Sequence, residues 1–263
     1  ALEHDSALAA AGEGALRIPA TPDGVADLAA LEEMLKSDGA PALVSLMLVN
    51  NETGVIQPVR QAAELARAHG ALLHCDAAQA AGRLPLDVTE LGCDLLTLSA
   101  HKLGGPAGIG GQERSARAGT QNLVGAAGFA AAAATAADDL ARVGDLARLR
   151  DLIEGELADR VPGLEIAGSR APRVAAVSCL VAAGCGGEKM VMRLDLAGFA
   201  VSAGSACSSG KVKPSHVLAA MGFSPEAAGS ALRVSLGWGT TEDEARRFVE
   251  AYAACCAGPR RTV

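Results

Sequence analysis

Three short apolar runs, each followed by polar residues that can carry chemistry, constrain the fold of this chain most. Residues 42–49 are almost continuously apolar and precede two asparagines, Asn50 and Asn51. Residues 71–75 precede Asp76, and residues 94–98 precede a Ser-Ala-His-Lys segment. Runs of this kind are typical of strands buried on both faces of a parallel sheet. The carboxyl ends of parallel strands meet at one edge, so the sequence predicts a ligand site there.

The segments around these runs have helical patterns. Residues 27–35 and 58–69 are predicted as helices, the second with Pro58 in its first turn and Gly70 just past its end. Strands that alternate with helices indicate an α/β fold with a doubly wound, parallel-rich sheet.

The second half of the chain predicts a smaller α/β unit. A small-residue helix over 124–137 is followed by an amphipathic helix marked by Leu146, Leu149, Ile153 and Leu157. We therefore expect a large domain over residues 1–140 and a small carboxyl-terminal domain over residues 141–263. Further strands are expected at 174–181, 200–202 and 231–236, helices at 188–196 and 215–221, and a last helix that opens with a capping box at Thr241 and Glu244.

Charge and cysteine content narrow the function. The net charge is −7 and there is no lysine- or arginine-rich run, so neither nucleic acid nor an anionic membrane is an expected target. Residues 129–137 are apolar but short, so we expect no membrane span. Seven scattered cysteines, an odd number, favour a reducing, cytoplasmic location over a disulfide framework. The adjacent Cys255 and Cys256 are expected late in a helix as packing residues.

Lys102 stands at the carboxyl end of a predicted buried strand. A lysine there is most often a solvated loop residue. It can also be an amine that forms a Schiff base with a carbonyl cofactor. The second interpretation is strengthened by Asp76 and Asn51, which are predicted at the same sheet edge.

Seven sequence segments, in order along nearly the whole chain, resemble the class V aminotransferase family of fold-type I pyridoxal-phosphate enzymes. Within that family, the chain is most similar to cysteine desulfurases of the iron–sulfur assembly type. The matching segments are Glu3-His4, Asn50 to Gly54, His74 to Gln79, Ser99 to Lys102, Gly111 to Thr120, and the pair formed by Gly204 to Gly210 with Leu232 to Gly237.

The resemblance implies a role for each cofactor residue. Lys102 would hold pyridoxal 5'-phosphate and move the substrate's α-proton. Asp76 would keep the pyridine nitrogen protonated, although a helix N-cap before residues 77–80 is an alternative role. Gln79 would bind the ring's phenolic oxygen, and His4, counted with the catalytic residues, would stack on the ring. Asn51 would bind cofactor or substrate; otherwise it is a turn residue.

The remaining roles concern phosphate and substrate. The resemblance implies that Ser99 and His101 bind the phosphate, with Thr120 reaching a phosphate across a dimer interface; otherwise the two hydroxyls are ordinary loop groups. Arg233 would clamp the substrate carboxylate in a bidentate pair. Without the motif, an arginine there is more often part of a rim salt bridge.

Cys207 separates a desulfurase from an aminotransferase. It lies among small polar residues, Gly-Ser-Ala-Cys-Ser-Ser-Gly, a setting for a mobile nucleophilic thiol. The resemblance implies a homodimer that converts L-cysteine to L-alanine and leaves a persulfide on Cys207, which passes to a scaffold or relay protein. The alternatives are a selenocysteine lyase, another class V lyase or transaminase, or a truncated, non-catalytic relative that binds assembly partners.

The chain departs from the family at two places. Family members begin with a further segment that includes a Gly-rich phosphate-binding turn, and no such turn precedes His4. A strand and loop are also missing near residues 110–111. The printed sequence is either a set of segments from a longer chain or a truncated protein. The first is favoured, because loss of a central strand leaves unpaired backbone in the core.

Overall fold

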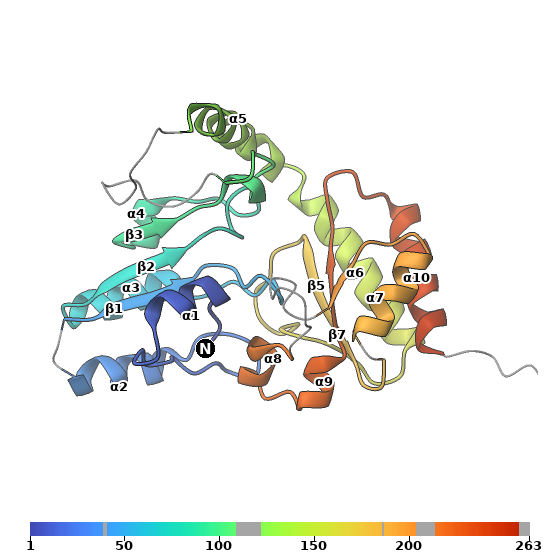
Figure 1. Cartoon of the computed structure of the whole chain (residues 1–263), viewed down its shortest axis with the longest axis horizontal. Helices are drawn as coiled ribbons and strands as arrows, with labels where there is room; N and C mark the ends of the chain where they lie inside the picture. Colours follow the sequence, from blue (N-terminus) through green and yellow to red (C-terminus); the bar gives the residue numbers. More distant parts are fainter. Residues whose placement is uncertain (39–40, 109–121, 186, 204–213, 258–263) are drawn as a thin grey trace, which may run out of the picture.

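The computed structural model describes residues 1–38, 41–108, 122–185, 187–203 and 214–257. In these ranges the chain forms two sheets that lie side by side, each with its own helices (Figure 1). The first sheet contains β1 (Leu43–Met47), β2 (Leu72–Asp76) and β3 (Leu95–Thr97), in that order and all parallel. The prediction of three parallel strands with their carboxyl ends at one edge is confirmed.

The two faces of this sheet differ. Val44, Leu46, Leu73 and Cys75 are buried and belong to the core shared with α3 (Val59–Ala68). Side chains alternate along a strand, so the residues between them point to the opposite face. Asp76 therefore points away from α3. That opposite face also carries Ser45, His74 and Thr97, together with the exposed Leu43 and Leu72.

Local sequence explains the helices of the first half. In α3, Val59, Ala62, Ala63 and Ala66 are buried at helical spacing, and the helix follows Pro58, its N-cap residue. The predicted helices over 27–35 and 124–137 are present as α2 (Leu28–Asp38) and α5 (Leu123–Leu140). In the first half, three short helical elements were not predicted: α1 (Asp5–Ala11), α4 (Val88–Leu91) and the 3-10 turn η1 (Ala100–Lys102). In the second half, the helix at residues 225–229 was not predicted.

The second sheet is antiparallel, with strand order β4-β5-β7-β6. Its strands are β4 (Leu164–Ile166), β5 (Val177–Ala182), β6 (Ser202–Ala203) and β7 (Ala231–Ser235). Helices α6 (Val143–Arg160), α7 (Gly187–Leu196) and α10 (Glu242–Cys256) share one core with it, and α8 (His216–Ala220) and α9 (Pro225–Gly229) share another. The predicted apolar stripe of α6 and capping box of α10 are both confirmed.

Helix α5 contradicts the expectation that no apolar stretch is long enough to cross a membrane. It has 18 residues and is apolar enough by composition, and only Gly125 among them is buried. The expectation considered only residues 129–137. The helix is longer at both ends: it begins at Leu123 and continues through Asp138 and Asp139 to Leu140. One helix that meets these criteria is weak evidence for a membrane protein.

The loop after β1 docks against the second sheet. Val174 N donates to Gly54 O at 2.9 Å, and Ile56 N donates to Pro172 O at 2.8 Å. Beside these bonds, Arg173 and Glu154 form a buried two-pronged ion pair of 2.7 and 2.8 Å. The β1 loop is therefore fixed to both halves of the chain. The division at residues 140 and 141 stays a prediction; it falls between α5 and α6.

Candidate active site

Asp76 and Lys102 come from neighbouring strands of the parallel sheet. Asp76 is the last residue of β2 and pairs with Thr97, the last residue of β3. Lys102 ends η1, the single turn that follows β3, and is half-buried. The carboxylate and the amine are therefore at the carboxyl edge of the sheet, as predicted.

Asp76 caps a turn and not a helix. Its Oδ1 accepts a hydrogen bond from Ala78 N at 2.9 Å, but residues 77–80 form turns with no helix among them. The helix-cap alternative for Asp76 is therefore wrong. A turn cap occupies one carboxylate oxygen and so remains compatible with a second role for the side chain.

A polar chain crosses the sheet beneath Asp76. His74 Nδ1 is 2.9 Å from Ser45 Oγ on β1, and His74 Nε2 is 2.8 Å from Thr97 Oγ1 on β3. His74 and Asp76 are two residues apart on β2 and so lie on the same face. The two hydroxyls fix the imidazole ring, which lies on the same sheet face as the predicted pyridine-binding carboxylate. Sequence reasoning gave His74 no role; its signal was its place two residues before Asp76.

The two asparagines after β1 have different roles. Asn50 is fully buried: its Oδ1 accepts bonds from Glu52 N and Thr53 N, and its Nδ2 donates to Leu2 O at 3.1 Å. It shapes the turn. Asn51 lies in that turn, half-buried, and its backbone carbonyl accepts a bond from Arg233 Nη1 at 3.0 Å.

Arg233 reaches this edge from the middle of β7. Its Nη2 is 3.4 Å from Ser202 Oγ, and its Nε is buried without a hydrogen-bond partner in the described part of the chain. Within that same part, Arg233 has no carboxylate within 4.0 Å, so the rim salt bridge does not form there. A buried guanidinium nitrogen left without an acceptor is costly and indicates that an anion or acceptor group belongs beside it.

Arg83 is a second guanidinium near this place, and sequence reasoning missed it. Burial lowers the pKa of Arg83, and the charge of Arg233 lowers it further. Its Nη1 donates to Gln79 Oε1 at 3.0 Å and to Gln79 O at 2.9 Å. The predicted ring-binding residue Gln79 is thus held by Arg83. Arg233 is close enough to Arg83 to lower the pKa of Arg83, so the two cations form a site suited to an anion.

The other predicted residues fall into two groups. Ser99 Oγ is 2.8 Å from His101 Nδ1, so the predicted phosphate-binding pair is together, just before Lys102. His4 is the N-cap of α1, and its Nδ1 is 2.7 Å from Ser6 Oγ. Thr120 and Cys207 lie outside the described residues.

Two buried carboxyl groups flank the site. Burial raises the pKa of Glu3 to about 7, and the bond that its Oε1 accepts from Met47 N opposes this rise only in part. The other carboxyl oxygen has no partner in the described residues. Burial also raises the pKa of Glu52, partly opposed by a bond to Ser215 and the charges of His216 and Arg233. His216 Nε2 is 2.9 Å from Glu3 O.

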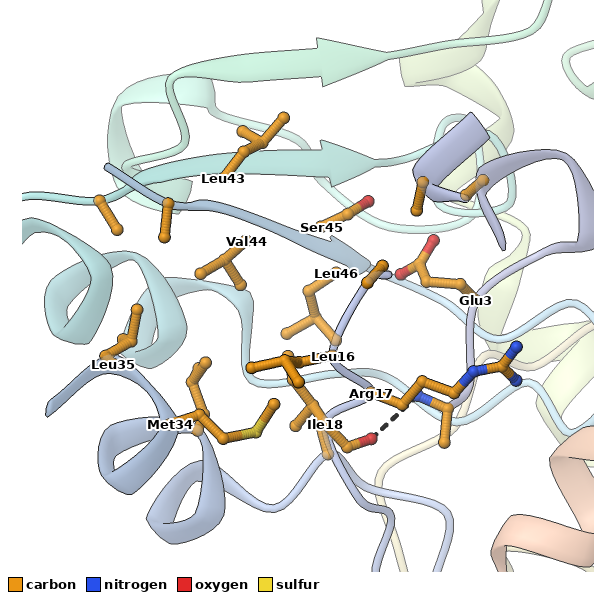
Figure 2. A pocket seen from close by; sticks show the side chains of 18 of the residues that line it. Glu3, Leu16, Arg17, Ile18, Met34, Leu35, Leu43, Val44, Ser45 and Leu46 are labelled. Carbon is orange, nitrogen blue, oxygen red and sulfur yellow. Dashed lines mark hydrogen bonds between the residues drawn. The ribbon is translucent and has the colours of Figure 1, made fainter. Parts of the chain in front are cut away.

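A cavity of about 470 Å³ lies elsewhere, between β1 and the first residues of the chain. Figure 2 shows apolar side chains such as Leu16, Ile18 and Leu46 around it, with Glu3 at one end. It is lined by neither Lys102 nor Arg233 and so is distinct from the candidate site.

The fold and the site define the class of protein: an α/β fold of the type found in pyridoxal-phosphate enzymes, with a lysine and an aspartate at one sheet edge. The aminotransferase class-V family model matches residues 1–111 and 111–248, and the chain belongs to this family. Members depend on pyridoxal phosphate, so the expected cofactor is confirmed for the family. The two matches meet within the region where a segment was expected to be missing.

The similar curated proteins are cysteine desulfurases. That of Klebsiella pneumoniae is 38% identical over 92% of this chain and 66% of its own length. The cysteine desulfurase of Cereibacter sphaeroides is 40% identical over 89% of this chain and 64% of its own length. An IscS-like cysteine desulfurase of Mycobacterium tuberculosis is 38% identical over 93% of this chain and 67% of its own length. The chain thus spans about two thirds of the length of these relatives.

Solved structures agree on the fold. A NifS-like protein from Rickettsia africae superimposes with a TM-score of 0.87 at 29% identity, over 97% of this chain and 73% of that one. The cysteine desulfurase CsdA of Escherichia coli superimposes with a TM-score of 0.76 at 25% identity, over 92% of this chain and 65% of that one. The predicted fold, a parallel-rich large domain with a smaller carboxyl-terminal α/β domain, is confirmed.

The residues present fit pyridoxal phosphate and an amino-acid substrate. The amine of Lys102 can bind a carbonyl group, and the carboxylate of Asp76 can hold a protonated ring nitrogen. The unpartnered Nε of Arg233, with Arg83 near it, suits a carboxylate.

Proposed function

We propose that this chain carries the catalytic machinery of a pyridoxal-phosphate-dependent L-cysteine desulfurase. The observation that carries the proposal is the convergence of Asp76, Lys102 and Arg233 on one sheet edge, where Arg233 has a buried and unpartnered Nε. The cofactor, when bound, withdraws electrons from the substrate's α-carbon. Asp76 would hold it through the ring nitrogen, Lys102 through its amine, and Ser99 with His101 through the phosphate.

The chain's own residues divide the remaining work. Arg233 orients the substrate through its carboxylate, and Asn51, whose carbonyl fixes that guanidinium, lies beside it. The amine of Lys102 moves the α-proton. The thiol of Cys207 attacks the substrate sulfur as the carbon–sulfur bond breaks. One cysteine and one thiol thus give alanine and one persulfide, with no external oxidant.

The setting of the enzyme is part of the proposal. We infer a cytoplasmic homodimer in which Thr120 serves the partner's phosphate, and a scaffold or relay protein that accepts sulfur from Cys207. Support comes from the cysteine desulfurase names of the relatives, one of them IscS-like, and from the scattered cysteines. Residues 1–140 are proposed as the large domain and residues 141–263 as the small one.

An absorbance spectrum of the purified protein tests the proposal most directly. A covalently held cofactor absorbs in the near-visible range, and added L-cysteine should change that band and release alanine. A selenocysteine lyase, or another class V lyase or transaminase, would show the band without releasing alanine from cysteine.

The alternative function is that of a non-catalytic relative that binds assembly partners. The same spectrum separates the two, because a non-catalytic relative without cofactor shows no near-visible band even after incubation with excess pyridoxal phosphate.

A further inference from the structure

A pair of thiols, separate from the candidate site, meets at the far end of the second sheet. Cys256, in the last turn of α10, has its Sγ 3.0 Å from the Sγ of Cys185, in the turn after β5. Both side chains are half-buried and both cysteines are free. A disulfide has an S–S length of about 2.05 Å, so closure needs an approach of roughly 1 Å.

The two elements that carry these thiols are held in place. Cys185 N donates to Ala182 O at 3.1 Å, which ties its turn to the end of β5. Next to Cys256, Arg193 of α7 donates from Nη1 to Cys255 O at 2.7 Å, and this bond fixes the last turn of α10. Tyr252, one turn earlier on α10, is buried beside the pair. The sulfur atoms therefore face one another because of the fold.

We propose that Cys185 and Cys256 form a redox modification site, a disulfide that closes by exchange with a low-molecular-weight disulfide such as oxidised glutathione. One cysteine sulfur attacks the small disulfide, forms a mixed disulfide and releases one small thiol. The second cysteine sulfur then displaces the other small thiol. Two electrons pass to the small disulfide, and the two thiol protons leave with its two sulfurs.

The bond closes a ring that contains most of the small domain. Residues 185–256 include α7, α8, α9, β7 and α10, and therefore Arg233. A cross-link over a loop of this size lowers the entropy of the unfolded chain more than a short one does. The oxidised protein should therefore keep its small domain folded at temperatures where the reduced protein unfolds.

Burial, together with the neighbouring Cys185 sulfur, raises the pKa of Cys256 to about 12. In a reducing solution the pair therefore stays as hydrogen-bonded thiols. The described residues contain no cluster of three metal-ligating side chains. The low thiolate fraction makes disulfide exchange at this pair slow, which distinguishes it from the nucleophilic thiol expected of Cys207.

Glutathione redox buffers test this site on the full chain. The protein is equilibrated at increasing ratios of oxidised to reduced glutathione, quenched with acid and an alkylating reagent, and digested for mass spectrometry. We expect a peptide that links Cys185 to Cys256 and a melting midpoint higher by roughly 5–10 °C in the oxidised protein. Cys185→Ser should lose both. Cys255→Ser, the matched control on the same helical turn, should keep both.

Two results overturn the inference. One is a glutathione adduct on Cys256 without the intramolecular link. The other is a link that is lost in Cys255→Ser. The comparison of oxidised with reduced wild-type protein needs no variant, so an unstable substitution leaves the test intact. The readouts are a peptide mass and a melting midpoint, so failure here does not affect the proposed desulfurase activity, nor does failure of that activity affect this site.

Discussion

Arg233 and Asn51 are joined across the two halves of the chain by a 3.0 Å hydrogen bond from guanidinium Nη1 to backbone carbonyl. The bond fixes one side of the guanidinium and leaves its buried Nε available. We therefore expect Arg233→Lys to lower kcat/KM for L-cysteine by about 10- to 100-fold, because lysine cannot reproduce the planar fork. Steady-state alanine release measures it, with cofactor absorbance as the control. An unchanged KM would contradict substrate binding by Arg233.

Lys102 should be essential. Lys102→Ala removes the amine that both holds the cofactor and moves the proton, so covalent attachment and turnover should disappear together. Borohydride reduction followed by peptide mapping measures attachment. If reduced cofactor were found on another lysine of the variant, the assignment of Lys102 would be wrong.

Asp76→Asn should retain cofactor but slow α-proton loss, because an amide does not stabilise a positive ring nitrogen. The loss of such a preorganised charge interaction costs on the order of 2–4 kcal/mol, or about 30- to 1000-fold in rate. Exchange of the substrate's α-deuterium gives the rate. The turn bond to Ala78 N survives in an asparagine, so folding should be little changed. Near-normal exchange would leave Asp76 as a turn cap only.

Cys207→Ser should separate binding from sulfur transfer. The variant keeps Lys102 and Arg233, so L-cysteine should still change the cofactor spectrum, whereas alanine and persulfide should not form, because a hydroxyl is a far weaker nucleophile toward sulfur. Mass spectrometry of wild-type protein without reductant should find one added sulfur on the Cys207 peptide. Wild-type rates of alanine release from the variant would favour another class V lyase or a transaminase.

Glu3 should make stability depend on pH. Its folded pKa is raised to about 7 from 4.5, so the folded state holds a proton that the unfolded state releases. The contribution of Glu3 to the free energy of unfolding should therefore be greatest below pH 4.5. It should fall by about 3 kcal/mol in all as the pH rises through 7. Glu3→Gln should lose this slope. Urea unfolding of both proteins from pH 4.5 to 8 measures it, and parallel curves would refute it.

The sequence predicted the elements best where burial follows a simple period. The continuous apolar run of β1 and the stripe along α6 left little choice of structure, and the capping box fixed the start of α10. Short elements escaped because they have too few residues to show a hydrophobic period. The turn η1 forms within a single Ser-Ala-His-Lys segment, and α1 depends on a cap from His4. The antiparallel order of the second sheet has no signature in alternating strands and helices.

Part of the site was also predictable. Asp76, Lys102 and Arg233 belong to residue types and positions with a chemical meaning, so motifs could single them out. Arg83 and the His74 chain were missed because their roles come from proximity. Arg83 matters through the charge of Arg233, which is far away in the sequence, and His74 through hydroxyl groups on two other strands.

The bond between His216 and the carbonyl of Glu3 spans 213 residues of sequence. During vectorial synthesis, Glu3 therefore leaves the ribosome long before its docking partner in α8 exists. Contacts of such high order form slowly and late, because the entropy of closing a long loop opposes them. The neighbourhood of His4 would then be among the last parts to mature, and a nascent chain that stops before α8 would have a parallel sheet but an unfinished catalytic edge.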